Sequence, residues 1–200
     1  MAHIRPYRTS DRDDMYEICL KTGRSGTDAT GWLDDDDLLP DIYALPYVDL
    51  APETAFVVDV EGRARGYILG VEDTAEFVER LRAKWLPAFE QKYPLTGEES
   101  TTQRIVRDGR RPERMLIPEL GDYPAHLHID LLPDLQGQGL GRMLVRTLLA
   151  ELTSRGVPAV WLEYAPDNVS AGAFYQRLGF APLPSSATGT RVGIRTDAVV

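Results

Sequence analysis

The sequence is poor in cysteine and in positive charge, and it contains no long apolar run. Cys19 is the one cysteine in 200 residues. This excludes an internal disulfide and a zinc site built from cysteines alone, and it fits a reducing compartment. The 22 Lys and Arg residues against 31 Asp and Glu residues give a formal net charge of −9, which argues against a nucleic-acid or anionic-membrane binder. No stretch approaches the roughly 18 apolar residues of a membrane span, and residues 1–5 lack the apolar core of a signal peptide. We therefore expect a cytoplasmic protein.

What remains is the composition of an ordinary globular protein. Hydrophobic residues make up 43% of the chain and charged residues 26%, and no internal repeat is present, so residues 1–200 are expected to form one domain. A helical and loop insertion is predicted at about 72–123. Periodicity and turn signals predict a mixed α/β (α+β) sheet with helices packed on it. The predicted strands are 3–8, 54–59, 65–71, 126–132, 159–164, 180–182 and 191–195, and the predicted helices are 11–21, 74–92, 139–155 and 170–178. Ser10 and Thr74 are the predicted N-caps of the first two helices.

Two segments carry no clear periodicity. Segment 23–52 is predicted to be irregular, and its acidic run 34–37 is either a solvated loop, a helix start or a metal site. Segment 93–123 is long for a plain connection and holds five arginines, which favours a lid, a substrate loop or a dimer contact. Between them, Phe77, Leu81, Trp85 and Phe89 follow helical spacing and are interpreted as core residues in preference to a ligand box.

A glycine-rich turn joins the strand at 126–132 to the helix at 139–155. Such a turn leaves backbone N–H groups unpaired at the positive end of a helix dipole, where phosphate oxygens can bind. The alternative is a glycine turn that only permits tight packing. The dinucleotide fingerprint Gly-x-Gly-x-x-Gly fails here, because its last position is Arg142 in one register and Leu144 in the other. A Walker P-loop also fails, because no Gly-Lys-Ser/Thr follows.

The turn instead resembles the coenzyme-A turn of the GNAT acetyltransferases, Gln/Arg-x-x-Gly-x-Gly/Ala. Here it reads Gln136-Gly137-Gln138-Gly139-Leu140-Gly141, with Pro133 before it. Further along, Asn168, Ala171, Phe174, Tyr175, Gly179 and Phe180 match that family's pattern Asn-x-x-Ala-x-x-Phe-Tyr-x-x-x-Gly-Phe. The resemblance implies the GNAT fold, which is a twisted, mostly antiparallel sheet with a splayed strand pair and helices on both faces. It also implies acetyl-CoA (coenzyme A) as cofactor.

The resemblance assigns the cofactor contacts. It implies that the backbone amides of 138–142 hold the pyrophosphate, that the edge of strand 130–132 binds the pantetheine arm, and that the Leu131 N–H polarises the thioester carbonyl. Arg142 and Arg146 either add positive charge or only cover the helix surface. The full expected set is Leu131, Leu132, Gln136, Gly137, Gln138, Gly139, Leu140, Gly141, Arg142, Asn168, Phe174 and Tyr175.

The resemblance also implies an acid, whereas the base is less defined. Tyr175 matches the tyrosine that protonates the departing thiolate in many GNAT enzymes, and the alternative is a tyrosine that only packs against the cofactor. Asn168 either contacts the pantetheine arm or caps the following helix. On the strand, alternation places His126, His128 and Asp130 on one face. Asp130 or His128 is the candidate base, with Glu163 in reserve, and no metal is expected.

A narrower resemblance is to the acetyltransferase-like domain at the C-terminus of animal O-GlcNAcase and its free-standing bacterial relatives. It rests on segments 18–22, 26–30, 85–93 and 129–133. The animal domain departs from the Gln-x-x-Gly-x-Gly turn that this chain keeps, and a glycosidase domain does not fit in 200 residues.

Three functions remain open at this point. The first is an N-acetyltransferase acting on an amine of a small molecule or protein by direct attack. The second is a catalytically silent acetyl-CoA-binding or protein-interaction module, and the third, weaker, is a nucleotide-binding oxidoreductase. Acceptor-side candidates are Asp28, Tyr123, His126 and the arginine-rich segment, and the state is expected to be monomer or homodimer. The net negative charge favours cationic acceptors.

Overall fold

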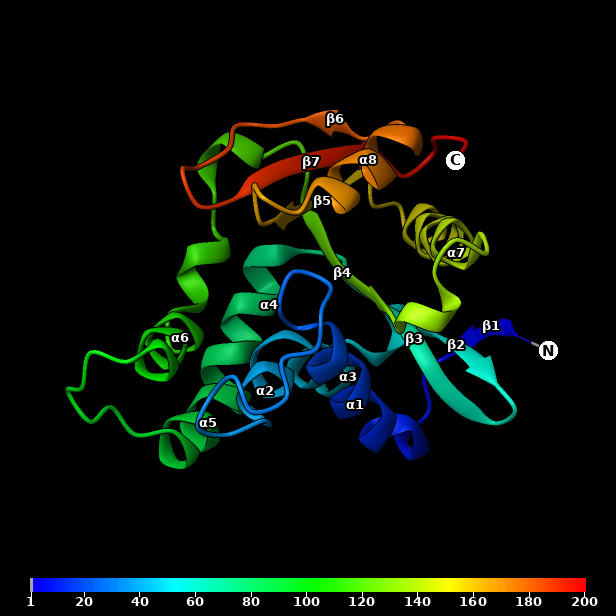
Figure 1. Cartoon of the computed structure of the whole chain (residues 1–200). Helices are drawn as coiled ribbons and strands as arrows, with labels where there is room; N and C mark the ends of the chain where they lie inside the picture. The colour runs from blue at the N-terminus through cyan, green and yellow to red at the C-terminus, as the bar shows by residue number, and fades with distance from the viewer. Residues whose placement is uncertain (1) are drawn as a thin grey trace.

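The computed structural model describes residues 2–200 and shows a seven-stranded sheet with helices on both faces (Figure 1). The strand order is β1-β2-β3-β4-β5-β7-β6. Neighbouring strands are antiparallel except β4 and β5, which form the one parallel pair among the described strands. The strands are β1 (His3–Pro6), β2 (Ala55–Val60), β3 (Arg63–Val71), β4 (Ala125–Leu131), β5 (Ala159–Tyr164), β6 (Ala181–Pro182) and β7 (Thr190–Arg195). The predicted mixed, mostly antiparallel sheet is confirmed.

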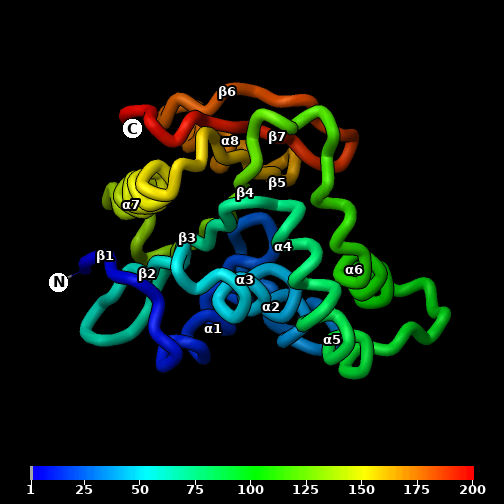
Figure 2. Tube along the Cα trace, turned by 180° about the vertical axis from the view of Figure 1, so that it is seen from behind, coloured from blue at the N-terminus to red at the C-terminus, as the bar shows by residue number. Residues whose placement is uncertain are grey.

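The helices divide between the two faces of the sheet, as Figures 1 and 2 show from opposite sides. Six helices pack on one face, where the buried strand residues include Tyr67 and Leu69. Helices α7 and α8 pack on the other, against residues such as Ile68 and Leu127. Because successive strand residues point to opposite faces, each strand supplies both cores. The helices are α1 (Arg12–Thr22), α2 (Leu38–Tyr43), α3 (Leu45–Leu50), α4 (Thr74–Arg80), α5 (Leu86–Lys92), α6 (Thr101–Gly109), α7 (Leu140–Ser154) and α8 (Val169–Arg177).

The starts of the first two predicted helices differ from the sequence-based expectation. Ser10 lies inside a 3-10 turn, Thr9–Asp11, so it does not cap α1. Asp73 caps α4, because its side chain accepts hydrogen bonds from the N–H groups of residues 75 and 76. The hydroxyl of Thr74 donates to the Pro124 carbonyl oxygen instead, at 2.7 Å. At α4 a neighbouring residue with cap chemistry thus takes the predicted position, whereas Asp11, which precedes α1, uses its carboxylate for Arg5 and the Arg8 N–H instead of capping the helix.

Both segments without periodicity contain helices. Segment 23–52 holds α2 and α3, and α2 starts directly after the acidic run, which ends at Asp37. Segment 93–123 holds α6 and two 3-10 turns. The predicted helix 74–92 is interrupted by a π-helical turn at Leu81–Trp85. Phe77, Leu81 and Phe89 are buried on its inner face, which confirms that they belong to the core.

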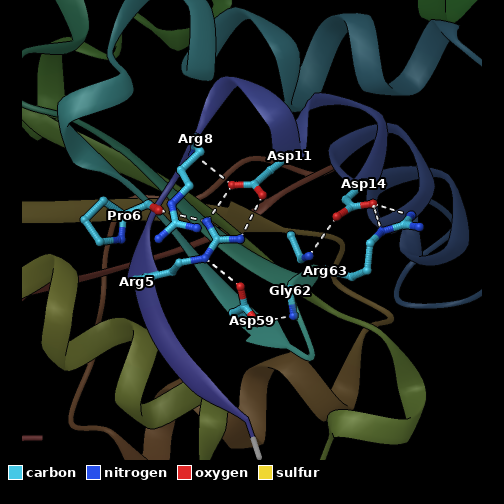
Figure 3. Close-up of polar contacts among 9 residues, drawn as sticks. Arg5, Pro6, Arg8, Asp11, Asp14, Asp59, Gly62 and Arg63 are labelled. Atoms are coloured by element: carbon cyan, nitrogen blue, oxygen red, sulfur yellow. Dashed lines mark hydrogen bonds and ion pairs between the residues drawn. The ribbon is translucent and has the colours of Figure 1, made fainter.

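A buried ion-pair network fixes β1 to its surroundings (Figure 3). The Arg5 guanidinium donates to both carboxylate oxygens of Asp11, at 2.6 and 2.8 Å, and to Asp59 on β2, at 2.7 Å. The three side chains are 8%, 3% and 6% exposed. Asp14 similarly joins α1 to β3, since it accepts from the Arg63 side chain and the Ala64 N–H. Removing one partner of the buried Arg5 network leaves a charge without compensation, so this network holds β1 in place, while the more exposed Arg63 covers the buried Asp14 carboxylate.

Among residues 2–200, no helix is both long and apolar enough to cross a membrane.

Candidate active site

Strands β4 and β5 pair only at their starts and then diverge. The pairs are Ala125 with Val160 and His126 with Trp161. On its other side, β4 stays paired with β3 as far as Leu131, and the Leu132 N–H donates to the Arg65 carbonyl oxygen at 3.1 Å. Because N–H groups alternate in direction along a strand, those of residues 129 and 131 point away from β3, into the splay. The predicted splayed pair is therefore present. The N–H of Leu132 points toward β3, where it is hydrogen-bonded, and does not face the gap between β4 and β5.

The turn after β4 presents a row of free backbone donors. Gly137 and Gly139 have φ of 74° and 80°, left-handed values that glycine adopts without strain. Within the described residues, none of the N–H groups of 137–142 donates to a protein acceptor. These donors lie at the N-terminus of α7, where the helix dipole is positive. Together they suit phosphate oxygens in number and in charge.

Side chains brace this turn from below. The Gln136 amide donates to the Leu131 carbonyl oxygen at 3.0 Å, and the Gln138 amide donates to the Asp134 carbonyl oxygen at 2.7 Å. A Cβ atom on Gly141 would lie 3.1 Å from Cζ of Phe174. Phe174 thus packs directly under the first turn of α7, and the glycine makes room for its ring. Leu140, in the same turn, is buried, whereas Arg142 and Arg146 are exposed and form no ion pair within residues 2–200.

Helix α8 places Tyr175 beside the splay. Its ring is 7% exposed and contacts Tyr164, Phe174 and Phe180, with centroids 5.2–5.6 Å apart. Burial, followed by the negative charge of Asp130, raises the pKa of Tyr175 above its ordinary value of 10. The phenol therefore stays protonated at neutral pH.

Asn168 is the N-cap of α8. Its side-chain oxygen accepts a hydrogen bond from the Ala171 N–H at 3.0 Å, which is the capping alternative raised from the sequence. The remaining side-chain N–H groups of Asn168 are not used by this cap.

His128 and Asp130 lie side by side on the opposite side of β4 from α7. Nε2 of His128 lies 3.0 Å from Oδ2 of Asp130, and the Tyr67 hydroxyl donates to the same oxygen at 2.7 Å. Because a carboxylate only accepts, the tautomer with its proton on Nε2 suits this neighbour, and in that tautomer Nδ1 keeps its lone pair. The His128 side chain is 35% exposed and that of Asp130 18%, so the pair can reach a reactant from solvent.

His126 has a different role from its neighbour two residues on. Its Nε2 lies 2.9 Å from the Tyr47 hydroxyl, and its Nδ1 lies 2.9 Å from the Thr74 hydroxyl. Because Thr74 donates to Pro124, Nδ1 must carry the proton and Nε2 must accept from Tyr47. Burial, with added repulsion from Arg114 and His128, lowers the pKa of His126 to about 3. His126 is thus a neutral core histidine, and the structure does not place it on an acceptor surface.

The other acceptor-side candidates are engaged in local contacts. Asp28 accepts from Lys21 at 2.8 Å and from Thr30, which lowers its pKa to about 2. The ring of Tyr123 packs on β7, where a Cβ atom on Gly193 would lie 2.5 Å from it. Glu163, the reserve base, forms an ion pair with Arg191 at 2.6 Å.

Two residues of this site were missed from the sequence. Tyr67 reaches Asp130 because the register of β3 and β4 places them opposite each other. Tyr43, at the end of α2, stacks on the His128 ring at 6.0 Å. No local pattern marks either residue, and only the strand register or the packing of α2 could have identified them.

The chain is similar to several acetyltransferases. The family model described as Acetyltransferase (GNAT) family matches residues 110–180. Over 106 residues the chain is 36% identical to the ribosomal protein bS18-alanine N-acetyltransferase of Escherichia coli strain K12, a match that covers 52% of this chain and 71% of that protein. The crystal structure of SsHAT superposes with a TM-score of 0.95 at 46% identity, covering 98% of this chain and 99% of that one.

A longer relative matches as well. Protein O-GlcNAcase of Rattus norvegicus is 25% identical over 180 residues, which cover 88% of this chain. The chain spans only 20% of the length of that relative. From the sequence matches and the shared fold, the chain belongs to the GNAT acetyltransferase family.

Proposed function

We propose that this protein is an acetyl-CoA-dependent N-acetyltransferase that acts on an amine by direct attack. The observation that carries the proposal is the row of unpaired N–H groups at 137–142, which starts α7 beside the open edge of β4. A phosphate-binding turn and a strand edge with free main-chain groups suit the two ends of coenzyme A.

The chain would hold the cofactor mainly through backbone atoms. The N–H groups of 138–142 would bind the pyrophosphate, and the N–H groups of Ile129 and Leu131, which point away from β3, would hydrogen-bond the pantetheine arm. Arg142 and Arg146 add positive charge on the exposed face of α7. When bound, acetyl-CoA supplies the acetyl group as a thioester.

His128 is the proposed base, and Asp130 positions it. With its proton on Nε2, 3.0 Å from the Asp130 carboxylate, His128 would have a free lone pair on Nδ1 that can take a proton from the acceptor amine. Tyr67, fully buried, fixes the carboxylate through the same oxygen. Stabilising the imidazolium in this way resembles the orienting role of a carboxylate behind a histidine base.

Tyr175 is the proposed acid. It lies on the α8 side of the splay, close enough to Asp130 for that charge to raise its pKa. Its hydroxyl can therefore give a proton to the departing thiolate at neutral pH.

The test combines binding and turnover. Calorimetric titration is expected to show acetyl-CoA binding to the wild type and to Tyr175→Phe and His128→Gln. Turnover on a panel of amines is expected to fall about 100-fold in both variants. Tyr164→Phe is the matched control, because its ring contacts Tyr175 from β5, and it should retain turnover within about threefold.

Two outcomes would contradict the proposal. Absence of acetyl-CoA binding at high micromolar concentration would remove the cofactor site. Binding without turnover on any amine, in wild type and variants alike, would support a catalytically silent acetyl-CoA-binding module.

A further inference from the structure

One arginine of the segment between α6 and β4 is linked to the proposed base through the ring of Tyr43. The guanidinium of Arg114 lies over the ring of Tyr43, 5.7 Å from its centroid. The same ring stacks on His128 with an interplanar angle of 23°. Tyr43 thus connects a positive charge to the histidine proposed to receive the acceptor's proton.

Specific contacts hold the part of the α6–β4 segment that contains Arg114 in place. Glu113, its neighbour, accepts from Nε and Nη2 of Arg82 at 2.8 and 2.6 Å. Nε of Arg114 itself donates to the Asp108 carbonyl oxygen at 3.2 Å. Arg114 also lines a largely apolar cavity, together with Tyr43, Tyr47, Phe77 and Met115. Arg114 therefore borders a cavity to which α2, α3, α4 and α5 also contribute lining residues.

The charge of Arg114 is not neutralised by the protein. Within residues 2–200 it forms no ion pair, whereas Arg107 of α6 and Arg110 directly after α6 lie 3.7 and 3.5 Å from Glu99 and Glu90. The positive charge of Arg114 is one of the causes that lower the pKa of His126, so its field reaches the start of β4. With Nε bonded to a carbonyl oxygen, the two terminal nitrogens can bind the two oxygens of one acidic group.

We propose that Arg114 recognises an acidic group on the acceptor, so that the substrates are amines that also carry a carboxylate or a phosphate. This inference rests on the proposed function and narrows it. The net charge of −9 draws the amine toward the protein, and Arg114 then selects the zwitterionic amines among those that arrive. Tyr43 sets the spacing between the bound acidic group and His128.

Matched acceptors test this recognition. A series of amino acids with increasing separation between the amine and the carboxylate is compared with the corresponding carboxamides and aminophosphonates. The wild type is expected to prefer the acids over the carboxamides by about 10- to 100-fold in kcat/KM, in line with a charge-assisted hydrogen bond. The aminophosphonates show whether the site takes a carboxylate or a phosphate.

Variants separate recognition from catalysis. Arg114→Gln should raise KM for the acids about 10-fold or more, lower kcat/KM for the carboxamides by no more than about threefold, and leave acetyl-CoA binding unchanged. Arg111→Gln is the matched control, because Arg111 is exposed, lies on the same segment and forms no ion pair within the described residues. Calorimetric titration of the preferred amino acid into the protein alone gives a second measurement, and its binding should be lost in Arg114→Gln and kept in Arg111→Gln.

Equal use of acids and carboxamides, or an equal loss for both in Arg114→Gln, overturns the inference and leaves the proposed function intact. If no amine is acetylated although acetyl-CoA binds, both fail together.

Discussion

The pH dependence of folding should reveal the neutral core histidine His126. In the unfolded chain a histidine has a pKa near 6.5, whereas burial holds the pKa of His126 at about 3 in the folded protein. Below pH 6.5 the unfolded chain therefore binds a proton that the folded protein does not. Above pH 6.5 His126 is neutral in both states and does not reduce the free energy of unfolding. As the pH falls from 6.5 toward 3, protonation of the unfolded chain lowers the free energy of unfolding progressively.

The size of this effect follows from the two pKa values. Between pH 7 and pH 5, proton uptake by the unfolded chain removes about 2 kcal/mol of the free energy of unfolding. The proton cannot be accommodated in the folded state because Nδ1 already donates to Thr74 and Nε2 accepts from Tyr47. A proton on Nε2 would place one N–H donor opposite another donor, the Tyr47 hydroxyl.

Urea unfolding at pH 7, 6 and 5 measures the effect. His126→Gln places an amide at this position that cannot titrate. Between pH 7 and pH 5, the free energy of unfolding of this variant should therefore fall by about 2 kcal/mol less than that of the wild type. The comparison cancels contributions from the other histidines, and pH 5 keeps the experiment above the range in which carboxylates dominate. Parallel pH curves for wild type and variant would refute the assignment of His126 as the histidine that cannot be protonated.

Two further predictions concern the turn before α7 and the N-terminal network. Gly139→Ala and Gly156→Ala place alanine at φ of 80° and 75°, so each should cost about 1 kcal/mol in urea unfolding. Only Gly139→Ala should weaken acetyl-CoA binding, by about fivefold in calorimetry, and equal affinities would contradict the role of the turn. Asp11→Asn leaves Arg5 partly uncompensated and should lower the free energy of unfolding by about 3 kcal/mol. The exposed Asp13→Asn should change it by less than about 0.5 kcal/mol, and similar losses in both would exclude the network as the cause.

Segments with strong local signals were predicted well from the sequence. The strand, glycine turn and helix of 125–154 were correctly placed, as were β5 and α8, because alternation, helical spacing and glycine positions are all local properties. The same local motifs predicted the GNAT family. By contrast, α2 and α3 were missed within segment 23–52. Each is six residues long, which is too short for periodicity to appear, and both are stabilised by burial in the core on that side of the sheet.

The sequence by itself determined the family, the order of elements and the turn with its free N–H groups, since all of these depend on residues close together in the chain. Only the tertiary structure decided the roles of the polar residues on β4. His126 and His128 are indistinguishable by alternation, yet one is enclosed by Tyr47 and Thr74 and the other is open beside Asp130. The positions of Tyr67 and Arg114 next to this strand depend on strand register and on how the α6–β4 segment packs. Such contacts join residues far apart in sequence, so no local pattern encodes them.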